Sequence, residues 1–256
     1  MEALRLATPA DVPAIADLYR SLSPESARMR FSSLLPPEAA DEFAALGPGA
    51  RAFVVELRGR VVAEGRYLPA GGTHEFSLTV ADEYQRLGYG PRLLNRLRED
   101  AREHGIGSLR AMVRVDNMLM LRLLQKVGCA VVEPVGGGVA VVDVATDDLM
   151  PAWPASDKRP RVLIESHGLW DDAATTALRA AGYDVRRCLL GRQRTRPCPL
   201  LTQGRCRLAE GADIVACLLP GSEEQTAGIA DEHAKARRLA ATSVHEWEQA
   251  VLKLLE

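Results

Sequence analysis

The chain has 256 residues, of which 47% are hydrophobic, and its formal charge is −2. This length allows one large domain or two modest ones with a real core, and the balanced charge gives no reason to expect nucleic acid or an anionic membrane as a partner. The apolar runs are far shorter than a bilayer span, and the N-terminus lacks the pattern of a signal peptide. We therefore expect a soluble, cytoplasmic protein.

The first part of the chain alternates between strand and helix patterns, which we identify by period-two alternation and by apolar stripes of helical spacing. In chain order the predicted elements are a strand over 3–8, helices that begin near Thr8, Ser23 and Pro36, strands over 51–57, 60–67 and 73–81, a helix over 91–104, a strand over 108–115, a helix over 117–127 and a hairpin over 130–144. Helices and strands in this order predict an α/β or α+β fold.

The composition changes over 147–160, where proline, serine and acidic residues are typical of a linker. From Arg161 onwards strands and helices alternate again, which predicts a second, small, open and mostly parallel unit of the Rossmann or flavodoxin-like kind. The predicted organisation is therefore a first domain over 1–146, a linker over 147–160 and a second domain over 161–256.

The stretch 75–90 combines a strand, a short polar loop that ends Gln-x-x-Gly-x-Gly, and the start of an amphipathic helix. This order places unpaired backbone N–H groups at a helix N-terminus, on a loop whose glycines allow close approach of a ligand. Both the N–H groups and the helix dipole favour an anion, so the stretch predicts a pyrophosphate site.

The residues of this stretch resemble a known signature. Val80 followed by Gln85-Arg86-Leu87-Gly88-Tyr89-Gly90 is similar to the acyl-CoA-binding motif (Gln/Arg-x-x-Gly-x-Gly/Ala) of the GCN5-related N-acetyltransferases, the GNAT family. The resemblance covers about residues 3–145, and Asn117 at the start of a helix that ends in Lys-x-Gly matches a second signature. Segments 21–26 and 28–31 look most like the bacterial protein-lysine acetyltransferases.

The resemblance implies a mixed sheet, splayed into a V and flanked by helices, with the pantetheine arm of acetyl-CoA in the split. Val80 would border the pantetheine, and Asn117 would contact it from the other side. It implies acetyl-CoA as cosubstrate and no metal. The cofactor-binding residues that it implies are Leu78, Thr79, Val80, Gln85, Arg86, Leu87, Gly88, Tyr89, Gly90 and Asn117.

Transfer of an acyl group to an amine requires removal of a proton, because lysine has a pKa of about 10.4 and is protonated at neutral pH. Glu75 is the candidate base, since it occupies the place of a glutamate in the protein-lysine acetyltransferases; the alternative is a solvated strand charge. A backbone N–H near Val80 would stabilise the oxyanion. Many family members carry a tyrosine that protonates the leaving thiolate, where this chain has Leu124, and His74 and Tyr84 are spare proton carriers.

The predicted function is transfer of an acetyl group from acetyl-CoA to an amine acceptor, and the resemblance favours a protein lysine. Two alternatives remain open. The first domain could bind acyl-CoA without catalysis and act as a sensor with the second domain as output, or it could acetylate a small amine such as an antibiotic or a polyamine. The second domain is expected to regulate the first or to recruit its acceptor.

The second domain has few chemical signals. Its start is weakly similar to a response-regulator receiver, but the acidic residues that such domains need are missing. The basic segment Arg192–Arg207 could attract an anionic ligand, the alternative being a solvated loop. The carboxyl ends of the predicted strands would form a generic crevice, lined by His167, Gly168, Gly191, Gly221 and Ser222. The four cysteines of this domain lack the close spacing of a zinc site. Cys198 and Cys206 could instead form a redox-sensitive disulfide, or Cys198-Pro199 could be a haem-responsive dipeptide.

Overall fold

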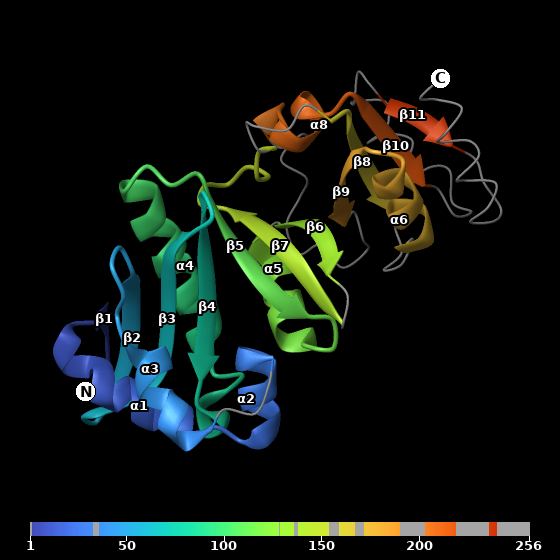
Figure 1. Cartoon of the computed structure of the whole chain (residues 1–256). Coiled ribbons are helices and arrows are strands. Elements are labelled where there is room, and N and C mark those ends of the chain that lie inside the picture. Colours follow the sequence, from blue (N-terminus) through green and yellow to red (C-terminus); the bar gives the residue numbers. More distant parts are fainter. Residues whose placement is uncertain are drawn as a thin grey trace. The chain divides into compact units, whose positions relative to one another are not determined.

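The computed structural model describes residues 2–32, 36–127, 129–135, 138–153, 159–166, 172–189, 203–218 and 236–239 (Figure 1). It divides the chain into two compact units, Met1–Leu123 and Leu124–Glu256. The boundaries that the sequence predicts, at 146 and 161, stay a prediction. No helix within the described ranges combines the length and the apolar character that crossing a membrane requires.

A mixed sheet forms the centre of the first unit. Its strands, in spatial order, are β1 (Glu2–Leu6), β2 (Arg51–Leu57), β3 (Arg60–Ala70), β4 (Thr73–Val80) and β5 (Ser108–Arg114). Neighbours from β1 to β4 are antiparallel, whereas β5 runs parallel to β4. The turn between β2 and β3 has Arg58 at φ +52° and Gly59 at φ +81°, the two positive values that a type I′ hairpin turn requires.

Helices follow the strands as the sequence predicts. In chain order they are η1 (Pro9–Asp11), α1 (Val12–Arg20), α2 (Pro24–Phe31), η2 (Pro37–Ala39), α3 (Ala40–Ala44), η3 (Asp82–Tyr84), α4 (Tyr89–Glu103) and α5 (Met118–Val127). Ser23 is the N-cap of α2, and its hydroxyl accepts a hydrogen bond from the backbone N–H of Ser26 at 3.3 Å. This cap fixes the start of the helix that lies nearest to the candidate site.

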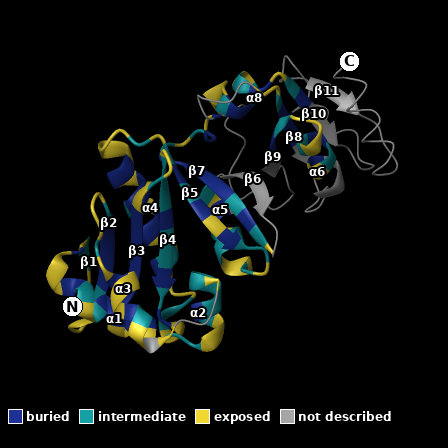
Figure 2. Cartoon of the chain, viewed as in Figure 1, coloured by how far each residue is buried: buried dark blue, intermediate teal, exposed yellow. Residues whose placement is uncertain are grey.

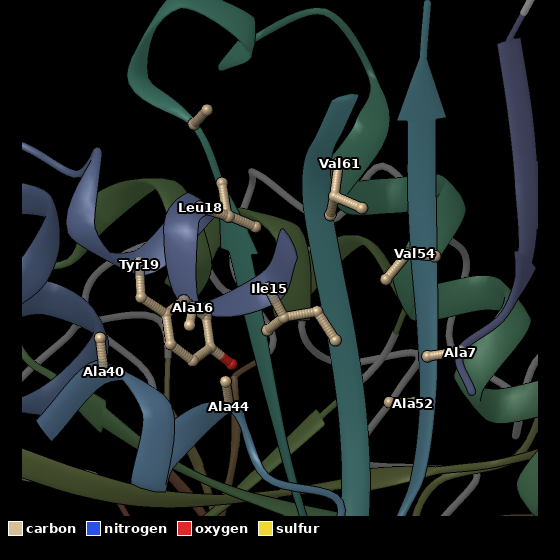
Figure 3. Close-up of a cluster of buried hydrophobic side chains, with 11 residues drawn as sticks. Ala7, Ile15, Ala16, Leu18, Tyr19, Ala40, Ala44, Ala52, Val54 and Val61 are labelled. Carbon is tan, nitrogen blue, oxygen red and sulfur yellow. The ribbon is translucent and has the colours of Figure 1, made fainter. Parts of the chain in front are cut away.

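The two faces of the sheet are covered by different helices. On one face, α1 and α3 pack through small and branched side chains, and Figure 3 shows Ile15 and Ala16 of α1 beside Val54 and Val61 of the sheet. On the other face α4 comes so close that a Cβ on Gly65 would lie 3.2 Å from Leu97 Cδ1. Most of β3 is buried between these layers (Figure 2). The confirmed fold is thus the mixed α+β sheet with helices on both faces.

The second unit contains a small parallel sheet, as predicted. Its strands, in spatial order, are β7 (Val139–Ala145), β6 (Cys129–Val135), β9 (Asp184–Leu189), β8 (Arg161–Ser166), β10 (Ile214–Leu218) and β11 (Ala236–Leu239). The last four are parallel, and the helices α6 (Asp172–Ala180) and α8 (Arg207–Gly211) accompany them. The hairpin β6–β7 joins this sheet because β6 pairs antiparallel with β9.

Part of the stretch with linker composition is packed rather than exposed. Met150 and Trp153 are 1% and 8% exposed and belong to a core cluster with Leu163 and Leu208. The indole Nε1 of Trp153 also donates a hydrogen bond to the backbone carbonyl of Leu208 at 2.7 Å. Residues 150–153 therefore contribute to the core of the second unit.

Candidate functional site

The strands β4 and β5 separate soon after they meet. Their ladder, within the described residues, contains one pair, Glu75 with Arg110. Beyond this pair the two strands diverge (Figure 1), so that residues 76–80 of β4 and 111–114 of β5 face a split instead of each other. This is the V-shaped splay that the sequence predicts, and Glu75 lies at its vertex.

The backbone of β4 presents polar groups to this split. The N–H of Ala81 donates to the carbonyl of Val62 at 3.0 Å, which shows that Ala81 faces the β3 side. Backbone groups of successive residues in a strand point to opposite edges. The N–H and C=O groups of Leu78 and Val80 therefore point away from β3 and into the split, where an extended amide-containing ligand could pair with them.

The loop after β4 adopts the conformation of an anion site. Arg86 has φ +62° and Gly88 has φ +92°, and Gly88 is the N-cap of α4 with no side-chain hydrogen bond to the first turn. The N–H groups of Tyr89 and Gly90 lie in this first turn, where a helix offers no backbone partner for them. Since Arg86, Leu87 and Gly88 are exposed, a pyrophosphate can reach these donors.

The two glycines of the signature have different physical roles. A Cβ on Gly88 would meet nothing within 4 Å, so this position needs glycine for its backbone angle rather than for space. A Cβ on Gly90 would lie 3.6 Å from Leu123 Cδ2, an ordinary contact. Gly90 therefore marks the place where the start of α4 lies against α5.

The side chain of Gln85 makes contacts within the protein. Its Nε2 lies 3.3 Å from the carbonyl of Val80 and 3.1 Å from Ser26 Oγ, to both of which it donates. Ser26 Oγ in turn donates to Asp82 Oδ1 at 2.6 Å, and the N–H and Oγ of Ser23 donate to the same carboxylate at 2.9 Å. This network connects the loop to the start of α2, and sequence reasoning missed it.

The electrostatics of Asp82 agree with this structural role. Burial raises the pKa of its carboxyl, but the hydrogen bonds from Ser26 and Ser23 outweigh burial and lower the pKa below its usual value. Asp82 is therefore ionised near neutral pH and acts as an acceptor for α2. The sequence signal was available in retrospect, because Ser23 is a helix cap and Asp82 lies in the turn that follows β4.

Asn117 opens α5, as predicted. Its Oδ1 accepts a hydrogen bond from the N–H of Met120 at 3.1 Å, which is the geometry of an N-cap. The preceding residue, Asp116, accepts from Arg114 Nε at 3.0 Å and from Arg28 Nη1 at 2.9 Å. These guanidinium groups, Arg114 first and then Arg28, lower the pKa of Asp116 to about 2. A contact of Asn117 with pantetheine stays a prediction.

Glu75 lies half-buried on the face of β4 opposite to α4. The register pairs Leu78 with Gly65, and both lie against α4, so alternation turns Glu75, Ser77 and Thr79 to the other face. Thr79 confirms this, since its hydroxyl accepts from Arg30 Nε of α2 at 3.0 Å. In the described part of the chain the carboxylate of Glu75 makes no hydrogen bond or ion pair, so it is available to accept a proton.

Three positions bear on protonation of the leaving thiolate. Leu124 is fully buried and carries no acidic group. His74 is on the α4 face of β4, with its ring 6.1 Å from that of Tyr67. The ring of Tyr84 stacks edge-on to that of Tyr89 at 6.3 Å. The group that protonates the leaving thiolate therefore stays open.

Several predictions for the second domain fall outside the described residues. These are the crevice residues His167, Gly168, Gly191, Gly221 and Ser222, the arginines at 192, 194 and 196, and Cys198. Among the described ones, Arg205 pairs with Glu210 and Arg207 with Asp147, while Arg186, Arg187 and Cys206 are buried. No group of three His, Cys, Asp or Glu residues in the described ranges could hold a metal ion.

The first part of the chain is similar to known proteins. Residues 14–129 match the model of the acetyltransferase (GNAT) family. The acetyltransferase Pat of Mycolicibacterium smegmatis is 33% identical over 100 residues, which are 38% of this chain and 30% of that protein. The match thus spans less than a third of the relative's length.

Two solved structures are similar in fold. The GNAT domain of S. lividans PAT is 23% identical with a TM-score of 0.49, covering 56% of this chain and 89% of that one. The protein yncA from Salmonella typhimurium, solved with its cofactor acetyl-CoA, is 23% identical with a TM-score of 0.45, covering 57% of this chain and 94% of that one.

Proposed function

Residues 14–129 of the chain belong to the acetyltransferase (GNAT) family, and from this premise we propose that the protein transfers an acetyl group from acetyl-CoA to the side chain of a protein lysine. The observation that carries the proposal is the position of Glu75 at the vertex of the split between β4 and β5. A proton acceptor and a place for an extended thioester-bearing ligand thus lie side by side.

The residues present fit acetyl-CoA. The N–H groups of Tyr89 and Gly90, at an N-terminus without a side-chain cap, would hold the pyrophosphate, and the backbone of Leu78 and Val80 would pair with the pantetheine arm. When bound, acetyl-CoA supplies an activated thioester carbonyl. GNAT homologues bind this same molecule, as the yncA structure illustrates.

In the proposed mechanism Glu75 accepts a proton from the ammonium group of the acceptor lysine, directly or through one water molecule. The neutral amine then attacks the carbonyl carbon of the thioester, the C–S bond breaks, and CoA leaves as a thiolate while the nitrogen loses its second proton to solvent. The N–H of Val80, which points into the split, donates to the carbonyl oxygen as negative charge develops there. Thr79 and Gln85 do not touch the reacting atoms; their side chains hold α2 and the loop in place.

Two features support lysine as the acceptor. The matched relative is the acetyltransferase Pat, and Glu75 carries a carboxylate with no cationic partner in the described part of the chain. A carboxylate of this kind suits a cationic acceptor, which must lose a proton before it can react. A small polyamine is also a cationic amine that must lose a proton, so it is tested as an alternative acceptor.

The test compares the wild-type protein with Glu75→Gln by release of CoA and by mass spectrometry of a lysine-containing peptide. We expect Glu75→Gln to lower kcat at pH 7 by about 10²- to 10⁴-fold, the usual range for a general base, and to leave the Kd of acetyl-CoA unchanged. The loss should shrink as the pH rises toward the lysine pKa of about 10.4. The matched control is Glu56→Gln, a strand carboxylate that pairs with Arg5.

Unchanged activity of Glu75→Gln would remove Glu75 from the mechanism. Binding of acetyl-CoA without turnover on peptides, polyamines or aminoglycosides would instead favour the second candidate, an acyl-CoA sensor. That candidate is supported by Leu124, because this buried leucine occupies the position where many family members carry a catalytic tyrosine.

A further inference from the structure

Two large apolar side chains stay exposed on the side of the sheet that carries the candidate base, and one of them is directly opposite it. Phe43 of α3 is 48% exposed and Leu68 of β3 is 39% exposed. Leu68 is the register partner of Glu75, so their Cβ atoms lie about 5 Å apart on the same face of the sheet. An apolar surface therefore adjoins the carboxylate that would deprotonate the acceptor.

Phe43 is held in place by a buried guanidinium. Arg66 lies two residues before Leu68 on the same face of β3 and is 5% exposed. Its Nη1 donates to the carbonyls of Phe43 and Ala45 at 2.9 Å, and its Nη2 donates to that of Ala44 at 3.2 Å. Arg66 thus binds the last carbonyls of α3, a position where a cation is favourable.

The buried partners of Arg66 fix this arrangement further. Arg66 Nε donates to Glu64 Oε1 at 2.5 Å, and Tyr19 donates to the other oxygen of Glu64 at 3.1 Å. Ala44 packs on the α1 side (Figure 3), so Phe43, one residue earlier in the helix, is turned away from that contact. The exposed ring is therefore a fixed feature, which is supported by a second aromatic ring, Phe31, at 5.1 Å.

The residues that precede Phe43 in the chain are rich in carboxylates. Glu38, Asp41 and Glu42 are all exposed, and only Asp41 has an ion-pair partner in the described part of the chain, Arg20. Unpaired carboxylates around an apolar surface favour a ligand that is both cationic and apolar.

We propose that Leu68 and Phe43 form a platform for the acceptor, on which Leu68 receives the aliphatic stem of the lysine and Phe43 an apolar side chain next to it. A lysine buries its methylene groups along apolar surface while its ammonium group stays in a polar environment, and Glu75 provides that environment beside Leu68. The preferred acceptor is then a lysine in a cationic peptide segment with an apolar neighbour. This inference rests on the proposed function.

The experiment measures kcat and KM on two synthetic peptides that differ only in whether leucine or serine flanks the lysine, and on spermidine. Phe43→Ala and Leu68→Ala should each raise KM for the leucine peptide by about 5- to 20-fold, the range expected for loss of one apolar contact. We expect changes below about twofold in kcat and in the Kd of acetyl-CoA, because neither residue touches the reacting atoms. Leu6→Ala, which removes a leucine that is 43% exposed on β1, is the control.

The outcomes separate the two proposals. If the wild-type protein acetylates neither peptide nor spermidine, the proposed function is overturned and the platform with it. If it acetylates the peptides but both variants keep the wild-type KM, the platform alone is overturned. If Phe43→Ala does not fold, Leu68→Thr is used in its place, since threonine is a good strand former. An unchanged KM for the leucine peptide in Leu68→Thr would then overturn the platform.

Discussion

Arg28 of α2 donates a hydrogen bond of 2.9 Å to Asp116, which lies 88 positions later in the turn before α5. At the start of α2, Ser23 and Ser26 donate to Asp82 in the turn after β4. Because β4 and β5 diverge, these two turns lie on opposite sides of the split. The helix α2 therefore connects the two sides and fixes their spacing.

Replacement of Arg28 by alanine should weaken acetyl-CoA binding more than it weakens the fold. Both side chains of the pair are more than a third exposed, so its contribution to stability is small. Without this connection, part of the binding free energy of acetyl-CoA is used to fix the spacing of the two strands. We therefore expect the Kd of acetyl-CoA to rise about two- to fivefold. Isothermal titration calorimetry measures this directly.

The control for Arg28→Ala is Arg205→Ala, which breaks another exposed pair, with Glu210 in the second unit. Arg205→Ala should leave the Kd of acetyl-CoA at its wild-type value. An equal Kd for wild type and Arg28→Ala would show that α2 does not set the spacing of the split.

The loop glycine Gly88 allows a test of backbone conformation alone. Its φ of +92° is unfavourable for any residue with a Cβ, although a Cβ would meet nothing within 4 Å. Gly88→Ala should lower the free energy of unfolding by about 1–2 kcal/mol and weaken acetyl-CoA binding, because the first-turn N–H groups of α4 change direction. Chemical unfolding and calorimetry give the two values.

Gly107 is the matched control for Gly88. A Cβ on Gly107 also meets nothing within 4 Å, and its φ lies outside the left-handed region. Gly107→Ala should be neutral or stabilise the fold by up to about 1 kcal/mol. If the two alanine variants unfold alike, the positive φ of Gly88 is not what the site requires.

The buried carboxylate of Asp100 should make stability depend on pH. It is 1% exposed and accepts hydrogen bonds from Arg51 Nε at 2.5 Å, Arg51 Nη2 at 2.6 Å and the hydroxyl of Tyr67 at 2.6 Å. Burial raises its pKa, but the hydrogen bonds from Arg51 and Tyr67 outweigh burial, so that the folded-state pKa lies below the usual value. A depressed pKa stabilises the fold above the unfolded value of about 3.9 and loses this effect as the pH falls.

Asp100→Asn should therefore lower the free energy of unfolding by about 2–3 kcal/mol at pH 7, since it leaves Arg51 without its charged partner. The difference from wild type should shrink as the pH falls from about 5 to 3. Urea unfolding at several pH values measures it, with Asp17→Asn, a 77% exposed carboxylate, as the control. A difference that stays constant down to pH 3 would contradict the assigned role of the Asp100 charge.

The sequence predicts those features of the site that depend on local chemistry. The Gln-x-x-Gly-x-Gly pattern predicts a glycine-containing loop at a helix start, and alternation along β4 predicts that Glu75 and Thr79 share a face. Both follow from neighbours in the chain, since a backbone angle and a strand period are set within a few residues. The order of strands and helices adds the mixed sheet.

The contacts that complete the site could not be predicted in this way. Ser26 lies 56 positions from Asp82, and Arg28 lies 88 positions from Asp116, and no local pattern distinguishes such partners from solvated polar residues. The same limit applies to Trp153, because a proline-rich stretch has the same composition whether it is exposed or packed. Tertiary packing decided each of these cases.

The hairpin β6–β7 lies in one sheet with the C-terminal strands, because β6 pairs with β9. Asp143 of β7 accepts from Arg186 Nη1 of β9 at 3.2 Å, and the Arg186 guanidinium, 1% exposed, lies 5.1 Å from the ring of Trp153. A chain truncated after residue 146 loses this partner for Asp143 and the strand that pairs with β6. An uncovered strand edge promotes association between chains.

We therefore expect the truncated chain to aggregate or to melt well below the full chain, as size-exclusion chromatography and thermal unfolding would show. In the full chain, Arg186→Met should lower the free energy of unfolding by about 3 kcal/mol, because it removes a buried guanidinium that donates to the buried carboxylate of Asp143. Arg207→Ala, which breaks the more exposed pair with Asp147, should cost at most about 1 kcal/mol. A truncated chain that is monomeric and binds acetyl-CoA with the wild-type Kd would instead establish residues 1–146 as the complete domain that the sequence predicts.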